Sequence, residues 1–314
     1  MAATFAIFAL GLLHGPASSA KLGARPSTRR TVVERAVALG GLAPAARLSA
    51  LLPAAALASA YLAEPASAAT AELKKVVVLG GSGFVGSRVC KQLVAHGAGV
   101  VSISRSGRPA LAGTWADKVE WVSADVSDEV LVAAQMKGAD AVISTLGVIF
   151  GNGAEADRAN NAKPNIAAAD AAAGANVPRF VYVSVSSQVG PVVSPLLGDG
   201  YFKGKADAEA EILGKFTADR SLLIKPTFIF GGDDFSLSPP RVSGAYGGII
   251  DSLLSSAPIR AIAGIAPGFI KLALLPPVSV DEVAAAAVAG ALGLKSGSVD
   301  GHDEIVAAAA LVSA

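Results

Sequence analysis

The sequence predicts an α/β protein with a doubly wound parallel sheet and a small, mostly helical region at its C-terminal end. Three observations support this fold class. An apolar strand at 76–79 runs into a glycine-rich turn and then into a helical pattern. Further apolar strands alternate with helical stretches as far as residue 226. The connections are short, and such alternation is typical of a parallel sheet with helices on both faces.

The first turn has glycine at every third position, at Gly80, Gly83 and Gly86. The first glycine permits the tight turn, the second lets a pyrophosphate approach bare backbone, and the third lets the helix pack close to the strand. Apolar residues then recur four apart, as in an amphipathic helix that covers a sheet. We therefore predict a dinucleotide-binding turn formed by Gly80, Gly81, Ser82, Gly83, Phe84, Val85 and Gly86.

The other elements follow in order along the chain. We expect strands at 99–104, 119–125, 139–145, 179–185 and 221–226, and long helices at 161–173 and 201–216. The predicted organisation is a targeting presequence over 1–73, a nucleotide-binding part over 74–230, and a C-terminal substrate-side region over 231–314 that completes the same domain.

The first 73 residues have the composition of a presequence that is removed. An apolar stretch ends in small residues, and the basic, hydroxylated stretch after it has no acidic residue before Glu34. Leu48 to Ala63 is uncharged and is interpreted as a second export signal; a retained membrane anchor is the alternative, although Pro53 interrupts the run. Such layering is similar to the presequences of plastid proteins in algae with complex plastids. We expect a plastid location with thylakoid association, and a mitochondrial one as the alternative.

The composition excludes several function classes. The net charge is +1 and 16% of residues are charged, so the chain lacks the basic footprint of a nucleic-acid-binding protein. Its three histidines are scattered and its one cysteine, Cys90, has no thiol partner. We therefore predict no nucleic-acid partner and no metal site.

The end of the second strand predicts which cofactor binds. A carboxylate there would hold the ribose 2′-hydroxyl of NAD, whereas an arginine accommodates a 2′-phosphate. This chain has Ser104 and Arg105 at that point and no acid, so NADP is expected, with NAD as the alternative. The competing interpretation is that Arg105 and Arg108 are solvated charges in a loop. Further cofactor contacts are expected from Asp125 and Val126 after the third strand and from Thr145, Leu146 and Gly147 after the fourth.

Tyr201 and Lys205 lie four residues apart, on one face of a predicted helix. A phenol has a pKa near 10, and a neighbouring ammonium together with a positively charged nicotinamide favours its phenolate. The pair can therefore exchange a proton with a substrate near neutral pH. Ser184 and Ser186 end the fifth strand, where a hydroxyl can hydrogen-bond a substrate carbonyl; strand-end capping is the alternative.

These motifs together resemble the atypical short-chain dehydrogenase/reductase superfamily, whose NAD(P)-binding domain is a Rossmann fold. The resemblance covers nearly all of 74–290 and is carried by GGSGFVG, Ala124-Asp125-Val126, Val183-Ser184 and YFKGKADAEAEIL. The segments at 225–231 and 276–280 resemble, more narrowly, a plastid-targeted branch of plants and algae. Its relatives include mitochondrial proteins linked to coenzyme Q synthesis and the nucleotide-binding accessory subunit of respiratory complex I.

The resemblance implies a role for each site residue. Tyr201 is expected to be the proton donor or base, Lys205 to hold the nicotinamide ribose, and Ser186, with Ser184 second, to orient the substrate. The turn after the fourth strand lacks the asparagine that many active reductases of the superfamily have there.

Three functions fit this pattern. The first is an NADPH-dependent oxidoreductase for a hydrophobic carbonyl or quinone-like substrate, because 245–275 is largely apolar. That composition also suits contact with a membrane surface or membrane complex, or an ordinary helical cap over the sheet. The second is a non-catalytic, nucleotide-bound assembly or stability factor for a membrane complex or for quinone synthesis. A sugar-nucleotide epimerase or dehydratase is least favoured, because this region offers few groups for a nucleotide diphosphate.

Overall fold

The computed structural model describes residues 73–109, 113–149, 152–231 and 274–313, with shorter stretches between 236 and 272. The chain divides into two units, Met1–Ala69 and Thr70–Ala314, and every described residue belongs to the second. Apart from Leu73, the predicted presequence lies outside the described residues, as does most of the apolar stretch at 245–275.

The centre of this unit is a seven-stranded sheet in which every neighbouring pair is parallel. Its spatial order is β11-β6-β5-β4-β1-β2-β3, so the strand order reverses between β1 and β4. In such sheets ligands bind outside the carboxyl ends of the strands at this reversal. The strands are β1 (Lys75–Leu79), β2 (Gly99–Ser104), β3 (Val119–Ser123), β4 (Ala141–Ser144), β5 (Arg179–Val183), β6 (Ser221–Lys225) and β11 (Gly297–Asp300).

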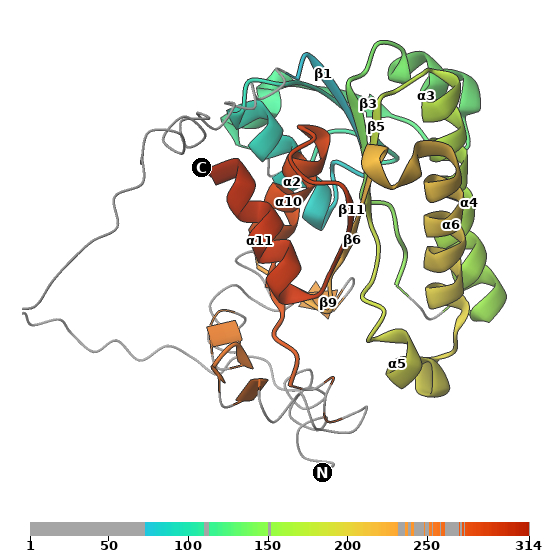
Figure 1. Ribbon diagram of the computed structural model, residues 1–314. Coiled ribbons are helices and arrows are strands. Elements are labelled where there is room, and N and C mark those ends of the chain that lie inside the picture. Colours follow the sequence, from blue (N-terminus) through green and yellow to red (C-terminus); the bar gives the residue numbers. More distant parts are fainter. Residues whose placement is uncertain are drawn as a thin grey trace, which may run out of the picture. The chain divides into compact units, whose positions relative to one another are not determined.

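Helices cover both faces of the sheet, as Figure 1 shows. One layer comprises α2 (Phe84–Ala95), α10 (Val280–Ala291) and α11 (His302–Ser313), and the other comprises α3 (Glu129–Met136), α4 (Ala154–Gly174) and α6 (Gly200–Arg220). The smaller elements are η1 (Thr114–Lys118), α5 (Gly190–Leu197), and the strand pairs β7 (Ile229–Phe230) with β10 (Val278–Ser279) and β8 (Ser236–Leu237) with β9 (Pro240–Arg241). The predicted doubly wound parallel sheet is confirmed.

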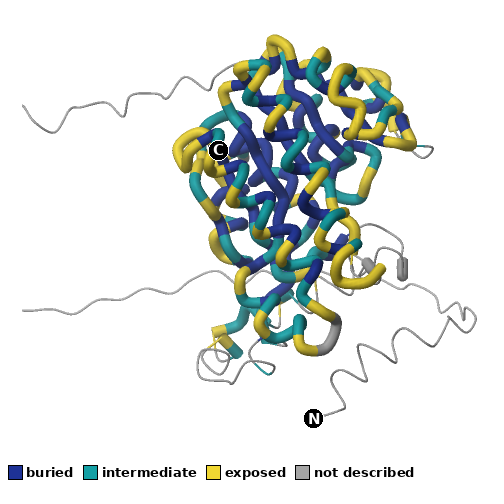
Figure 2. The backbone as a smooth tube through the Cα atoms, turned by 90° about the vertical axis from the view of Figure 1, so that its right-hand side faces the viewer, coloured by how far each residue is buried: buried dark blue, intermediate teal, exposed yellow. Residues whose placement is uncertain are grey.

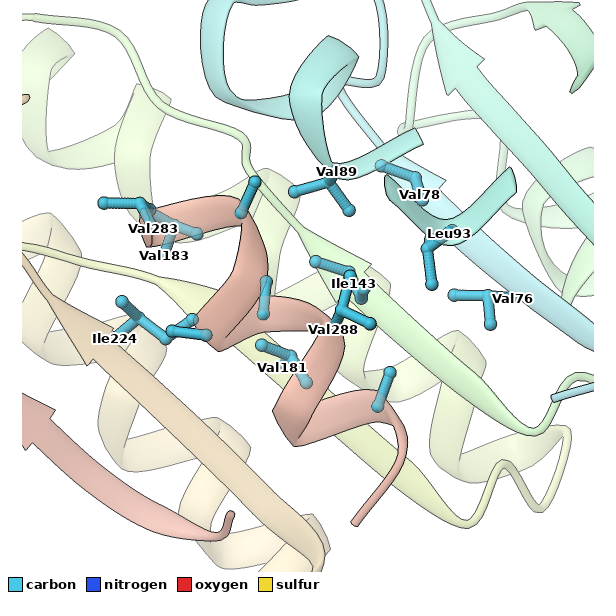
Figure 3. Close-up of a cluster of buried hydrophobic side chains, with 14 of the residues drawn as sticks. Val76, Val78, Val89, Leu93, Ile143, Val181, Val183, Ile224, Val283 and Val288 are labelled. Carbon is cyan, nitrogen blue, oxygen red and sulfur yellow. The ribbon is translucent and has the colours of Figure 1, made fainter. Parts of the chain in front are cut away.

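The strand side chains alternate between two separate cores. On β5, Val181 and Val183 pack beneath α10, whereas Phe180 and Tyr182 face α4 and α6. Figure 3 shows the first of these cores, with α10 lying across the strands. Both faces of the central strands are therefore buried, which explains their nearly continuous apolar sequence. Figure 2 shows this buried centre inside a partly exposed shell.

The C-terminal segment 278–313 belongs to the core. The predicted mostly helical C-terminal region is confirmed by α10 and α11, and it also contains β11, a seventh strand beside β6, while α10 packs on α2. Helix α10 is rich in alanine and valine, and nine of its residues are buried. Such small side chains lose little conformational entropy on burial. Helices α3 and α5 were also not anticipated, because both are short.

Two glycines let α6 lie directly against α4. A Cβ atom on Gly200 would lie 1.9 Å from the carbonyl oxygen of Ala154, and one on Gly204 would lie 2.4 Å from that of Arg158. The missing side chains therefore allow close backbone approach between the two helices. This packing brings polar residues of α4 close to Lys205 on α6.

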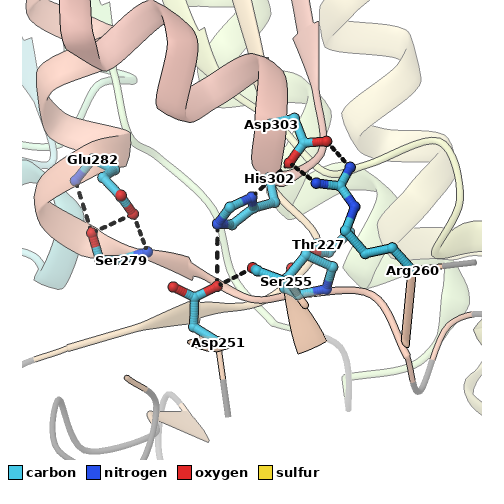
Figure 4. A network of polar contacts seen from close by, with 9 residues as sticks. Thr227, Asp251, Ser255, Arg260, Ser279, Glu282, His302 and Asp303 are labelled. Atoms are coloured by element: carbon cyan, nitrogen blue, oxygen red, sulfur yellow. Dashed lines mark hydrogen bonds and ion pairs between the residues drawn. The ribbon is translucent and has the colours of Figure 1, made fainter. Parts of the chain in front are cut away.

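A polar network joins the described residues between 251 and 260 to the start of α11 (Figure 4). The His302 ring lies between two carboxylates, with Nε2 3.1 Å from Asp251 and Nδ1 2.9 Å from Asp303. Ser255 also donates a hydrogen bond to Asp251, and Arg260 pairs with Asp303. These contacts fix that stretch of chain to the core.

Within the described residues, no helix combines the length and apolarity needed to cross a membrane. The described His, Cys, Asp and Glu side chains likewise form no group of three that could hold a metal ion.

Candidate functional site

The glycine turn joins β1 to α2 with a geometry that requires glycine at two positions. Gly80 has φ +82°, and its N–H donates to the carbonyl oxygen of Ile103 on β2. A Cβ atom on Gly86 would lie 2.2 Å from the carbonyl oxygen of Gly80. Gly83 is exposed, and the only neighbour a Cβ atom would meet there is that same oxygen, at 3.0 Å. Its backbone is therefore open to a ligand, as a bound pyrophosphate requires.

The N-terminus of α2 lacks the side-chain cap found on two other helices. The α3 N-cap, Asp128, accepts from the N–H of Leu131, and Ser279 with Glu282 forms a capping box on α10. The α2 N-cap is Gly83, with no capping side chain and no acidic residue in the first turn. The positive end of its helix dipole is therefore left for an anion.

Three serine hydroxyls meet between the glycine turn and the end of β2. The Ser82 hydroxyl lies 2.9 Å from that of Ser104 and 2.8 Å from that of Ser106. Arg108 pairs with Asp117 at 2.6 Å, whereas the exposed Arg105 makes no ion pair within the described part of the chain. Arg105 thus lies in the chain between two of these serines and has no carboxylate partner among the described residues, a combination that suits a phosphate group.

Asp125 and Val126 follow β3 as expected. Hydrogen bonds from the Ser127 N–H and hydroxyl lower the pKa of Asp125, with a smaller contribution from Arg105. Asp125 is exposed and Val126 is buried. The carboxylate thus shapes the turn next to Arg105, while Val126 packs into the core on the face covered by α3, α4 and α6.

The end of β4 is held by contacts on both sides. Thr145 donates from its hydroxyl to the carbonyl oxygen of Leu79 at 2.9 Å, which ties this strand end to the glycine turn. The buried amide of Asn161 on α4 both accepts from the N–H of Val148 and donates to its carbonyl oxygen. Asn165, one turn later, accepts from the Ser144 hydroxyl at 2.6 Å. Two amide side chains of α4 thus hold the turn that follows β4.

Sequence reasoning missed these two asparagines. The polar exceptions on the buried face of this alanine-rich helix are Asp157, Asn161 and Asn165, and the two asparagines are fully buried. Their spacing of four, opposite a strand end, was the available signal.

Lys205 is buried at the ends of β4 and β5. Its Nζ donates to the carbonyl oxygens of Leu146 at 3.1 Å and Val183 at 3.0 Å, and lies 4.8 Å from the ring centroid of Tyr182. Burial lowers the pKa of Lys205 to about 7, although the Glu209 carboxylate raises it. A Cβ atom on Gly147 would lie 2.9 Å from this ammonium, so Gly147 lets the loop pass over it.

Tyr201 lies one turn before Lys205, with its ring packed edge-on against Phe202. Burial raises the pKa of Tyr201 to about 12, opposite to the lowering expected from a neighbouring ammonium. Desolvation is the one cause of this shift, and the neighbouring ammonium does not offset it. In this state the Tyr201 phenol is a proton donor.

A second tyrosine, Tyr182, lies beneath Lys205. Its hydroxyl has no hydrogen-bond partner among the described residues, and burial, with Tyr201 and Glu209 nearby, holds its pKa well above 10. Tyr182 therefore stays neutral and offers Lys205 the face of its ring.

The two candidate serines differ in the hydrogen bonds that their hydroxyls make. Ser184 donates its hydroxyl hydrogen bond to Glu209 on α6. The fully buried Ser186 accepts from the N–H of Gln188 at 3.3 Å and retains a donor. Among the described residues, the Ser186 hydroxyl proton therefore has no hydrogen-bond acceptor, whereas that of Ser184 is bonded to Glu209.

The expected cofactor residues form one continuous edge. Ser82 joins the glycine turn to the end of β2, Thr145 joins it to β4, and Lys205 joins β4 to β5 and α6. A protein family described as NAD(P)H-binding matches residues 80–214, which contain this edge. An uncharacterized chloroplastic protein of Arabidopsis thaliana is 39% identical over 230 residues, covering 68% of this chain and 70% of its own length.

The chain belongs to the NAD(P)-binding, Rossmann-type family of short-chain dehydrogenase/reductase-like proteins. Yeast MIOREX complex component 2 is 33% identical over 85 residues, covering 26% of this chain and 31% of its own. The 2-alkyl-3-oxoalkanoate reductase of Stenotrophomonas maltophilia is 30% identical over 189 residues, 52% of this chain and 54% of that enzyme. This chain therefore spans about half of that enzyme's length.

Solved structures agree on the fold. The NAD⁺ complex of WbmH from Bordetella bronchiseptica is 19% identical, with a TM-score of 0.50 over 73% of this chain and 76% of that one. UDP-glucose 4-epimerase from Brucella ovis is 20% identical, with a TM-score of 0.50 over 73% and 77%. At such identities the likeness extends to the fold alone.

Proposed function

We propose that this protein is an NADPH-dependent oxidoreductase acting on a hydrophobic carbonyl or quinone-like substrate. The observation that carries the proposal is the placement of Tyr201 and Lys205 on one face of α6, with the Lys205 ammonium held where β4 and β5 end beside the glycine turn. In this proposal Lys205 binds the nicotinamide ribose and Arg105, with its neighbouring hydroxyls, binds the 2′-phosphate.

The chain's own residues supply the proton of the reaction. When bound, the reduced nicotinamide supplies a hydride and its electron pair to the substrate carbonyl carbon. Tyr201 donates its phenolic proton to the carbonyl oxygen, which becomes a hydroxyl, and then regains a proton from solvent. The Ser186 hydroxyl hydrogen-bonds the same oxygen and orients it. The raised pKa of Tyr201 fits donation to an oxygen that gains negative charge.

Apolar side chains near the strand ends support a hydrophobic substrate. Val148 and Ile149 follow β4 and Phe228 follows β6, and each is more than a third exposed. Exposed apolar residues that gather beside a polar site suit a largely apolar ligand. The names of two relatives also support a hydrophobic substrate. One is the 2-alkyl-3-oxoalkanoate reductase, and the other is a 3β-hydroxysteroid dehydrogenase/isomerase of Mycobacterium tuberculosis that is 30% identical over 186 residues.

Replacing Tyr201 with Phe tests the reductase directly. NADPH oxidation with an alkyl 3-oxo acid or a short-chain quinone should fall by about 100-fold or more, because the general acid is lost. NADPH affinity should stay within about twofold, because Lys205 remains. Equal turnover by the wild type and Tyr201→Phe would contradict the assigned role.

A nucleotide-bound assembly factor is the second candidate. Two observations favour it: the match to MIOREX complex component 2, and the hydrogen bonds that the Lys205 ammonium already donates to two backbone carbonyl oxygens. In that case the wild type binds NADPH, shows no turnover with any carbonyl, and copurifies with a larger complex that Tyr201→Phe leaves intact.

We further propose a plastid location, with a mitochondrial one as the alternative. The composition of 1–73 and the chloroplastic relative support it. A fluorescent protein fused behind residues 1–73 should enter plastids, and fractionation of the full chain would test thylakoid association.

A further inference from the structure

Helix α6 carries a third ionisable side chain on the face that holds Tyr201 and Lys205. Glu209 lies one turn beyond Lys205, and its side chain is only 16% exposed. Its carboxylate accepts from the Ser184 hydroxyl and pairs with Nζ of Lys225 at 2.9 Å. Since Ser184 follows β5 and Lys225 ends β6, one carboxylate joins both strand ends to α6.

The charge of Lys205 depends on its surroundings. Its direct contacts, two carbonyl oxygens and the Tyr182 ring, are neutral. The ionisable groups around it are Tyr201 and Glu209 on α6, Tyr182 on β5 and, through Glu209, Lys225 on β6. Of these groups only Glu209 is a carboxylic acid, and its carboxylate raises the pKa of Lys205 against the effect of burial.

We propose that Glu209 is a positioning residue: its carboxylate keeps the buried Lys205 ammonium charged and holds the ends of β5 and β6 around it. The role rests on the proposed function, in which Lys205 binds the cofactor ribose. Lys225 competes for the same carboxylate and therefore weakens its effect on Lys205. The assignment also explains why Ser184 is not the serine that meets the substrate.

The charge of Lys205 can be titrated directly without nucleotide. We would label the full chain with ε-¹³C lysine, follow the Lys205 signal by NMR against pH, and assign it with Lys205→Met. Glu209→Gln should lower the midpoint by about one pH unit or more. Lys225→Met should raise it, because Glu209 then has no competing cation. Glu211→Gln, which removes the separate pair with Lys215, should leave it unchanged.

The opposite signs separate charge from loosened packing. A general loss of structure would move the midpoint in the same direction in Glu209→Gln and Lys225→Met. That result, or an unchanged midpoint in Glu209→Gln, would overturn the proposal. Thermal unfolding of each variant verifies that it is folded at the temperature of the titration.

NADPH affinity measured against pH gives the functional counterpart. At pH 8, Glu209→Gln should bind about tenfold more weakly than Glu211→Gln, and the difference should shrink to about twofold near pH 6, where Lys205 is mostly charged in Glu211→Gln and about half charged in Glu209→Gln. If the wild type binds no NADPH, the proposed function is wrong. The NMR titration would still decide whether Glu209 keeps Lys205 charged.

Discussion

The two halves of the candidate site consist of different kinds of chemical group. The nucleotide half, at the ends of β1 and β2, consists of bare backbone, serine hydroxyls and the exposed Arg105. The reaction half, at the ends of β4 and β5, buries Lys205 and Tyr182 beside the partly exposed Tyr201. Steric and dipole requirements therefore govern the first half, whereas desolvation governs the second, where it is the largest cause of the pKa shifts of Lys205, Tyr182 and Tyr201.

The largest effect is expected from the nucleotide half, with Gly86→Ala. The new Cβ would lie 2.2 Å from the Gly80 oxygen and 2.7 Å from the Gly81 Cα, and both are backbone atoms that cannot turn aside. We expect a loss of about 3 kcal/mol in unfolding free energy, and loss of NADPH binding. Urea unfolding and calorimetric titration measure the two.

Gly214→Ala is the matched control, because a Cβ there meets nothing within 4 Å in α6. It should stabilise the chain by up to about 1 kcal/mol and leave binding unchanged. Wild-type nucleotide affinity in Gly86→Ala would show that the turn does not cradle the cofactor.

Lys205→Met tests the reaction half through pH. The pKa of Lys205 is about 7 in the folded chain, against an ordinary value near 10.4 when unfolded. Between these values the unfolded chain binds the extra proton, so wild-type stability is full above about pH 10 and is lost as pH falls towards 7. The stability of Lys205→Met should lack this pH dependence, because methionine does not bind a proton.

We would measure unfolding free energies at pH 7, 8.5 and 10. As pH rises, the unfolding free energy of the wild type should increase relative to that of Lys205→Met by at most about 1.4 kcal/mol per pH unit. Parallel pH profiles for the two proteins would mean that the buried amine is fully charged or well solvated. NADPH affinity should fall about 10- to 100-fold in the variant.

A smaller effect is expected from Asn161→Ala. The substitution leaves the N–H and carbonyl of Val148 without their side-chain partner, which should cost about 2 kcal/mol of stability and raise KM more than it lowers kcat. Its exposed neighbour Asn160 serves as the control. Equal stability of the two alanine variants would remove Asn161 from the description of the site.

The sequence predicted the nucleotide half better than the reaction half, for a physical reason. The glycine spacing, the expected strand at 99–104 and the Arg105 position are local features, and the doubly wound sheet follows from alternation along the chain. Asn161, Asn165 and Glu209 act across elements that meet only after α4 and α6 pack together through Gly200 and Gly204. The spacing of Asn161 and Asn165 marks one face of α4, but no pattern within a single element reveals which helix packs against that face.

The pKa of Tyr201 illustrates the same limit. A nearby ammonium predicts a lowered pKa, but burial raises it to about 12 and partly neutralises Lys205. The four-residue spacing gives the shared helical face, whereas burial depends on the packed structure. The C-terminal β11 was missed similarly, since four residues in a small-residue segment carry little strand signal.

The most direct test of the account is calorimetric titration of the full chain with NADPH and NADH, using the wild type, Arg105→Ala and Arg108→Ala. We predict that the wild type binds NADPH at least about tenfold more tightly than NADH, through one charged contact to the 2′-phosphate. Arg105→Ala should abolish that difference, and Arg108→Ala, whose guanidinium is paired with Asp117, should keep it. Equal wild-type affinity for both nucleotides, or binding of neither, would contradict the account.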